Sequence, residues 1–101
     1  MIKDIYNHYG KEHQLEKMLE ESYELQEATR NLLWLIKAYQ CNDKESRIEK
    51  AVQHLAEEIA DVRIMCDQLE YGLNLQEQCE DQRRYKLVRQ VARIEKEKNN
   101  G

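Results

Sequence analysis

The stretch LEKMLEESYELQEATRNLLWLIKAY, residues 15–39, sets the architecture of this chain. Its apolar residues recur at intervals of three and four, the spacing that places side chains on one face of an α-helix. A second stretch, IEKAVQHLAEEIADVRIMCDQL at residues 48–69, repeats this pattern 37 positions later, so that Leu25 corresponds to Val62. The two stretches are therefore predicted to be amphipathic helices that correspond residue by residue, as if related by a local two-fold axis.

The composition favours helices along the whole chain. Among its 101 residues there are three glycines and no proline, and this length supports one domain, residues 1–101. Breaks are predicted at Gly10, at residues 41–43 and at Gly72, which leaves a short helix near residues 2–9 and three longer helices. Because the connections are short, we expect an all-α fold in which the three longer helices form an antiparallel bundle.

The end of the second long helix carries two capping signals. Gly72 is predicted to end this helix in a left-handed conformation, as glycine often does. Asn74, followed by Glu77, resembles a capping pair that opens the third long helix. The tail of that helix, residues 96–101, is expected to fray. Its apolar set is sparse and consists of Leu75, Leu87, Val88, Val91 and Ile94.

The charges exclude some classes of partner. The net charge is −4, although residues 83–98 carry seven Lys or Arg against two Glu. An acidic chain is not expected to bind nucleic acid, so the basic segment either forms a solvated helix face or binds phosphate groups. No apolar run approaches the ~20 residues of a membrane span, and the first residues do not resemble a signal peptide. Three cysteines without a metal or redox spacing indicate reduced thiols, so we expect a soluble, cytoplasmic protein.

Two acidic motifs lie inside the two amphipathic stretches. They are Glu21-x-x-Glu24 and Glu58-x-x-Asp61, and they occupy corresponding positions. At about 100° per residue all four carboxylates lie on the same side of their apolar stripes, whereas the glutamate before each motif points towards water. Like charges this close need compensation, and Mg²⁺ prefers oxygen ligands while it keeps waters for a phosphate substrate. The sequence therefore predicts a magnesium site, in which Mn²⁺ could substitute, and an enzyme that acts on phosphate esters or anhydrides.

Other interpretations of these residues remain open. Acidic pairs at this spacing are common on solvated helix faces. They can also be neutralised in a salt-bridge network, for which the candidate partners are Lys17, Arg63, Lys86 and Arg89. An iron or zinc site is not favoured, because neither motif contains the histidine pattern of those helix signatures. His54 projects near the acidic face, at the position that corresponds to Lys17, and is interpreted as a surface residue or a substrate contact.

At these residues the chain resembles the MazG-like all-α nucleoside triphosphate pyrophosphohydrolases, a superfamily that includes dimeric dUTPases and phosphoribosyl-ATP pyrophosphatases. The family signature is Glu-x-x-Glu, a spacer and Glu-x-x-Asp, which stand here as EESYEL at residues 20–25 and EEIADV at residues 57–62. Similar flanking segments are YGKEHQLEKMLEE, residues 9–21, and GLNLQEQCEDQRRYKLVRQVARI, residues 72–94. These flanking segments are similar to those of short, phage-type members, whereas the spacer between the two motifs, 33 residues, is longer than in the compact members.

The resemblance implies hydrolysis of a nucleoside triphosphate between its α and β phosphates, which gives a monophosphate and pyrophosphate in nucleotide-pool house-cleaning. The residues that would hold Mg²⁺ are Glu21, Glu24, Glu58 and Asp61. Of these, Glu21 or Glu24 would accept a proton from the attacking water. The residues that would neutralise the phosphates are Lys17, Lys86 and Arg89.

The resemblance also implies association into a homodimer or a homotetramer, with the base in a cleft between subunits. A wide apolar surface, which includes all of residues 32–35 around one helical turn, favours the same conclusion. Two alternatives stay open. The same fold could act on dUTP or phosphoribosyl-ATP, or the chain could be a non-enzymatic helical adaptor whose acidic residues are merely solvated.

Overall fold

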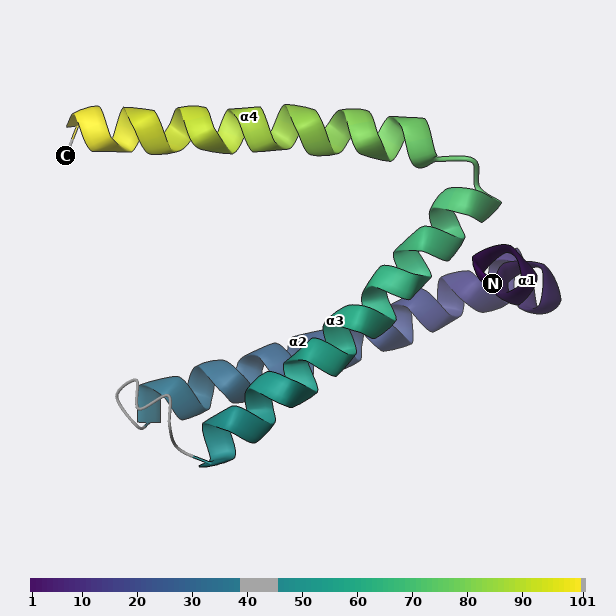
Figure 1. The fold of residues 1–101 in the computed structure, drawn as a ribbon, viewed down its shortest axis with the longest axis horizontal. Helices are drawn as coiled ribbons and strands as arrows, with labels where there is room; N and C mark the ends of the chain where they lie inside the picture. Colours follow the sequence, from purple (N-terminus) through teal and green to yellow (C-terminus); the bar gives the residue numbers. More distant parts are fainter. Residues whose placement is uncertain (39–45, 101) are drawn as a thin grey trace.

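The computed structural model describes residues 1–38 and 46–100. This part of the chain contains helices and no strand (Figure 1). In chain order the helices are α1 (Ile2–Tyr9), α2 (Lys11–Ala38), α3 (Ser46–Gly72) and α4 (Gln76–Asn100). The predicted all-α class is confirmed, with a short helix followed by three longer ones. The break predicted at residues 41–43 lies outside the described residues. Within the described part, no helix has the length and apolar character needed to cross a membrane.

The helices α2 and α3 pack against each other along a narrow seam (Figure 1). In α2 the seam residues recur every seven positions, at Gln14, Glu21, Ala28 and Leu35. In α3 they recur in the same way, at Ala51, Glu58 and Met65. A seven-residue repeat keeps one stripe of a helix facing its partner. The two helices are antiparallel, because Gln14 near the start of α2 bonds to Gln68 near the end of α3, while Leu35 packs with Ile48 at the opposite end.

The predicted apolar stripe is wider than this seam. Leu15 and Leu19 on α2, and Val52 and Ile59 on α3, are exposed. At about 100° per residue these four side chains lie on one side of the seam, whereas Lys17, Glu24 and Asp61 lie on the other. The α2–α3 hairpin therefore has an acidic face and, opposite to it, an uncovered apolar face formed by those four residues.

The helix α1 packs across one end of the hairpin through Tyr6. The Tyr6 ring lies edge-on to the Tyr71 ring, with the centroids 5.8 Å apart. It also lies so close to Gly72 that a Cβ atom there would overlap the ring. Position 72 therefore needs glycine for packing. Between α1 and α2, Gly10 has φ 88° and donates its N–H to the Tyr6 carbonyl oxygen, so the chain turns in a conformation that favours glycine.

The left-handed residue after α3 is Asn74 and not Gly72. Asn74 has φ 57°. Its N–H donates to the Tyr71 carbonyl oxygen at 3.2 Å, and the Leu75 N–H donates to the Glu70 carbonyl oxygen at 2.7 Å. These two bonds form a Schellman motif, in which asparagine can replace glycine. The predicted left-handed Gly72 and the predicted Asn74 cap of α4 are both wrong, because α3 stays helical through Gly72 and Asn74 supplies the turn.

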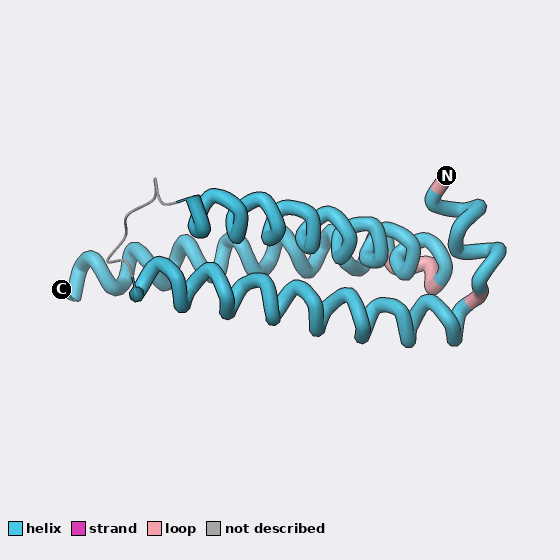
Figure 2. The backbone as a smooth tube through the Cα atoms, turned by 90° about the horizontal axis from the view of Figure 1, so that it is seen from below, coloured by secondary structure: helices cyan, strands magenta, loops and turns pink. Residues whose placement is uncertain are grey.

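The helix α4 extends away from the hairpin (Figure 1). Among the described helices it contacts only α3, and it contains no buried residue. The molecule is consequently flat, with extents of 45 × 38 × 19 Å (Figure 2). The described residues of one chain thus do not confirm the predicted bundle of three longer helices. The helix also continues through residues 96–100, where fraying was predicted. Its exposed apolar stripe consists of Leu87, Val88, Val91 and Ile94.

Candidate metal centre

Two carboxylates lie inside the α2–α3 seam at corresponding positions. The side chains of Glu21 and Glu58 are only 12% and 10% exposed. In each residue the Oε2 atom is buried and has no hydrogen-bond partner. Burying a carboxylate oxygen without a partner is unfavourable, and buried polar atoms in folded proteins are almost always bonded. These two unpaired oxygens are therefore the feature of the fold that most needs a physical explanation.

Glu24 joins these two residues, and Asp61 lies beside them. One carboxylate oxygen from each of Glu21, Glu24 and Glu58 lies within 4.8 Å of the others, and we call these three residues the acidic cluster. Glu24 is exposed, so the cluster opens to solvent. Asp61 is also exposed and is not part of the cluster, although its charge acts on Glu21. The structure thus brings together three of the four predicted carboxylates and places the fourth next to them.

A basic side chain flanks each buried glutamate. Lys17 Nζ lies 3.4 Å from Glu21 Oε1, and His54 Nε2 lies 3.8 Å from Glu58 Oε1. Each flanking residue also contacts the exposed glutamate that precedes its partner, so the arrangement repeats the correspondence between the two helices. These contacts reach only the Oε1 atoms. The two Oε2 atoms stay unpaired.

The predicted salt-bridge network forms only in part. Lys17 contributes to it, but within residues 1–38 and 46–100 no ion pair joins Arg63, Lys86 or Arg89 to the acidic cluster. Lys86 and Arg89 lie on α4, where they line a shallow pocket of about 180 Å³. Within one chain, the structure does not bring these two predicted phosphate ligands to the carboxylates.

The surroundings of Glu21 disfavour its ionised form. Burial raises the pKa of Glu21 above its ordinary value, and the charges of Glu24 and Asp61 raise it further, while the hydrogen bond from Lys17 lowers it. Hydrogen bonds to Glu20 and Glu21 raise the pKa of Lys17. A bound cation would favour the ionised carboxylates, because it adds the opposite charge at the place where they repel one another.

The donor atoms suit a hard divalent cation. All three atoms of the acidic cluster are carboxylate oxygens, with no histidine or cysteine among them. Such oxygens suit Mg²⁺ and Mn²⁺, whereas softer metals select nitrogen and sulfur ligands. A cation between the helices would also offset the charge of the two buried carboxylates, each of which has an unpaired oxygen. The residues present therefore fit Mg²⁺.

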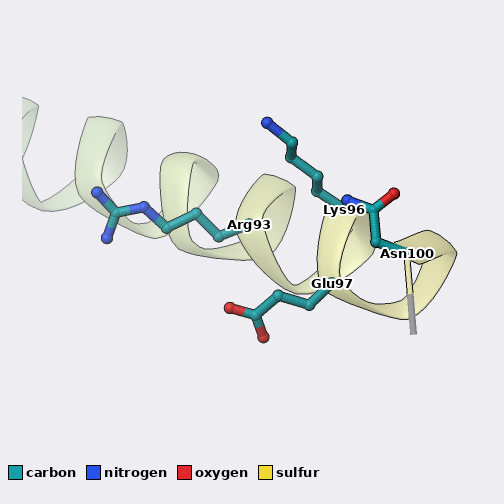
Figure 3. Close-up of a pocket in the computed structure, with 4 residues that line it drawn as sticks. All are labelled: Arg93, Lys96, Glu97 and Asn100. Carbon is teal, nitrogen blue, oxygen red and sulfur yellow. The ribbon is translucent and has the colours of Figure 1, made fainter.

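A surface pocket of about 400 Å³ lies at the end of α4 (Figure 3). Its lining residues are Arg93, Lys96, Glu97 and Asn100. All of them belong to one exposed helix, and their side chains spread outward from it (Figure 3). This pocket is an open surface with no opposing wall, so the acidic cluster is the better candidate for a functional site.

A buried amide pair near the acidic cluster was missed in the sequence. Gln14 Nε2 donates to Gln68 Oε1 at 2.7 Å, and the two residues are 3% and 2% exposed. His13 Nδ1 donates to Gln14 Oε1 at 2.6 Å. A signal was present, because Gln14 precedes Glu21 by one seven-residue repeat and so occupies a seam position where an apolar side chain is the norm.

No protein-family model, curated protein or solved structure matches the chain.

Proposed function

We propose that this chain is a Mg²⁺-dependent hydrolase that cleaves nucleoside triphosphates between the α and β phosphates, releasing a monophosphate and pyrophosphate. One observation carries the proposal: the buried Oε2 atoms of Glu21 and Glu58 have no partner, and both residues share a 4.8 Å group with Glu24. A solvated acidic face would leave these atoms exposed, and a structural salt-bridge network would leave them paired. A site for a dication explains why the two Oε2 atoms are neither exposed to solvent nor hydrogen-bonded.

The residues of the site divide into a rigid and an exposed part. Glu21 and Glu58 would hold Mg²⁺ from inside the seam, where packing restricts their side chains. Glu24 and Asp61 would hold it from the exposed side, from which a substrate can approach. When bound, Mg²⁺ neutralises charge on the phosphates and makes a bound water more acidic. Glu21 or Glu24 accepts the proton of the attacking water, and Lys17, beside Glu21, contacts the phosphate chain.

The proposal includes a homodimer, or a homotetramer. The apolar face of the hairpin and the apolar stripe of α4 are both uncovered within one chain. Burying such surfaces stabilises an assembly by roughly 25 cal/mol per Å², and a chain of 101 residues has only a small core of its own. A second copy could also bring its α4 to the acidic face, which would supply the Lys86 and Arg89 side chains that the chain's own α4 keeps away.

A nucleotide panel with pyrophosphate detection tests this function. The panel contains the common ribo- and deoxynucleoside triphosphates, dUTP and phosphoribosyl-ATP, with and without Mg²⁺. We expect Mg²⁺-dependent pyrophosphate release that Glu58→Gln reduces by at least about a hundredfold, the usual scale for loss of an electrostatic catalytic group. Glu57→Gln is the matched control, because Glu57 is the exposed neighbour with the same charge. Equal turnover by the two variants would remove Glu58 from the site.

A second candidate function is a non-enzymatic helical adaptor. The exposed apolar stripe of α4, Leu87, Val88, Val91 and Ile94, favours it, because such a stripe can bind another protein. An adaptor would release no pyrophosphate from any member of the panel, and Mg²⁺ at millimolar concentration would not bind it saturably. Either positive result therefore distinguishes the enzyme from the adaptor.

A further inference from the structure

A pocket lies next to the acidic cluster, between α1, the start of α2 and the end of α3. Its volume is about 360 Å³, which is within the range of about 300–1,000 Å³ typical of small-molecule sites. Side chains from all three helices form its walls, whereas the two pockets described on α4 are each lined by that helix alone. The lining residues that matter here are Tyr9, His13, Gln14, Lys17, Ile64 and Gln68.

The position of the pocket relates it to the proposed phosphate site. Lys17 lines the pocket and also lies 3.4 Å from Glu21 Oε1, so the two sites share a side chain. Gln14 precedes Glu21 by seven residues, which is about 10.5 Å along a helix at 1.5 Å per residue. In a nucleotide the sugar separates the base from the phosphate chain, so two sites placed one after the other along α2 can hold the two ends of one molecule. On the helical wheel, Gln14 lies in the seam, and His13 and Lys17 lie on the same side of it as Glu24.

The walls of the pocket combine flat and apolar surfaces. The rings of Tyr9 and His13 are stacked, with centroids 4.7 Å apart and an interplanar angle of 16°. Ile64 adds an exposed aliphatic side chain, and Tyr9 is half exposed, so both are accessible to a ligand. A planar, largely apolar heterocycle is the kind of ligand that stacks on such surfaces.

The buried amide pair provides polar groups for recognition. An amide group has two N–H donors, and Gln14 uses one of them on Gln68 Oε1. Within the described residues, the Gln68 amide nitrogen donates to the Met65 sulfur at 3.7 Å, which is a weak acceptor. Donor capacity therefore remains on both amides at a pocket that is otherwise mostly apolar. Few, fixed polar groups in an apolar pocket are the usual means of recognising one small molecule.

We propose that this pocket binds the nucleobase of the triphosphate whose phosphates bind at the acidic cluster, with the Gln14–Gln68 pair contacting the polar edge of the base. The proposal rests on the proposed function and adds to it the site that recognises the base, which lies within a single chain. It differs from the arrangement implied by the family resemblance, in which the base lies between subunits.

Binding measurements with two kinds of ligand test this inference. Isothermal titration calorimetry in Mg²⁺ compares the α,β-methylene analogues of four nucleoside triphosphates, which resist cleavage at that bond, with inorganic tripolyphosphate, which has no base. We expect at least one analogue to bind at least tenfold more tightly than tripolyphosphate, a difference of 1.4 kcal/mol. The variant Gln68→Leu should lower this affinity ratio about tenfold. The control Asn31→Leu, at the exposed position of α2 that corresponds to Gln68, should leave the ratio unchanged.

The outcomes separate this inference from the proposed function. If tripolyphosphate and all four analogues bind with equal affinity, the base pocket is overturned and the metal and phosphate site stays in place. The same holds if Gln68→Leu weakens the binding of tripolyphosphate and of the analogue by the same factor. Absence of tripolyphosphate binding in Mg²⁺ would overturn the proposed function, and the base pocket with it. Because Gln68 is buried, the half-exposed Tyr9 provides a second variant that spares the core: Tyr9→Ala should also lower the ratio, and an unchanged ratio in that variant would contradict the pocket.

Discussion

Replacing Glu58 by glutamine should stabilise the protein in the absence of Mg²⁺. The carboxylate of Glu58 is buried in the seam, its Oε2 atom has no partner, and two other carboxylates lie within 4.8 Å. Glutamine has nearly the same shape and no charge, and its amide can donate a hydrogen bond to Glu21. The substitution therefore removes repulsion without creating a cavity.

The magnitude follows from the geometry. Two unit charges 4.8 Å apart repel by about 3.5 kcal/mol at an effective dielectric constant of about 20. Solvent at the exposed Glu24 and the flanking Lys17 offset part of this energy, so we expect a net gain of about 1–3 kcal/mol, the range for relief of an unsatisfied buried group. For a domain near this size, each 1 kcal/mol shifts the melting temperature by about 4–8 °C.

The assay is thermal unfolding in EDTA and in increasing Mg²⁺. In EDTA, Glu58→Gln should melt at least about 4 °C above the unsubstituted protein. In Mg²⁺ at 100 times its dissociation constant, the difference in melting temperature between the two proteins should shrink or change sign. The reason is that only the unsubstituted protein gains the binding free energy of about 2.7 kcal/mol. The control Glu57→Gln should follow the unsubstituted protein in both conditions, since Glu57 is exposed. A lower melting temperature of Glu58→Gln in EDTA, with an unchanged response to Mg²⁺, would refute this reasoning.

Three further predictions concern pH, packing and assembly. Because the pKa of Glu21 is raised above 4.5 in the folded state, its contribution to stability is complete below that value and is lost as the pH rises through the raised pKa. In EDTA, as the pH rises from 4.5 through this raised pKa, the melting temperature of the unsubstituted protein should therefore fall relative to that of Glu21→Gln. A difference between the two melting temperatures that does not change with pH would contradict the burial of Glu21. Gly72→Ala should destabilise the fold by about 1–3 kcal/mol in urea unfolding through overlap with the Tyr6 ring, and the loss should shrink in a Tyr6→Ala background. Val91→Glu should reduce the molar mass in sedimentation equilibrium to that of one chain, while the neighbouring Gln90→Glu should not, and equal masses for the two variants would exclude the α4 stripe from the interface.

The helices and the pairing of the acidic motifs follow from local spacing. Three- and four-residue periodicity is sufficient to predict α2 and α3, because a helix places such residues on one face whatever packs against it. The correspondence of Glu21 with Glu58, and of Lys17 with His54, follows from the same 37-residue shift. Local spacing was less informative at the helix ends. Glycine is the residue type most often found in a left-handed cap, yet it is Asn74, and not Gly72, that has the left-handed conformation after α3.

Whether each side chain is buried, and which atoms it meets, depended on the approach of other helices. Periodicity placed Glu21 and Glu58 beside an apolar stripe, but only the packing of α2 on α3 puts them inside the seam and leaves their Oε2 atoms unpaired. In the same way, position 72 must be glycine because the Tyr6 ring, from the other end of the chain, packs against it. The Gln14–Gln68 hydrogen bond likewise joins two different helices. Such contacts connect residues distant in sequence, so no local pattern encodes them, and the free energy of each buried polar atom is set by partners that only the folded chain brings near.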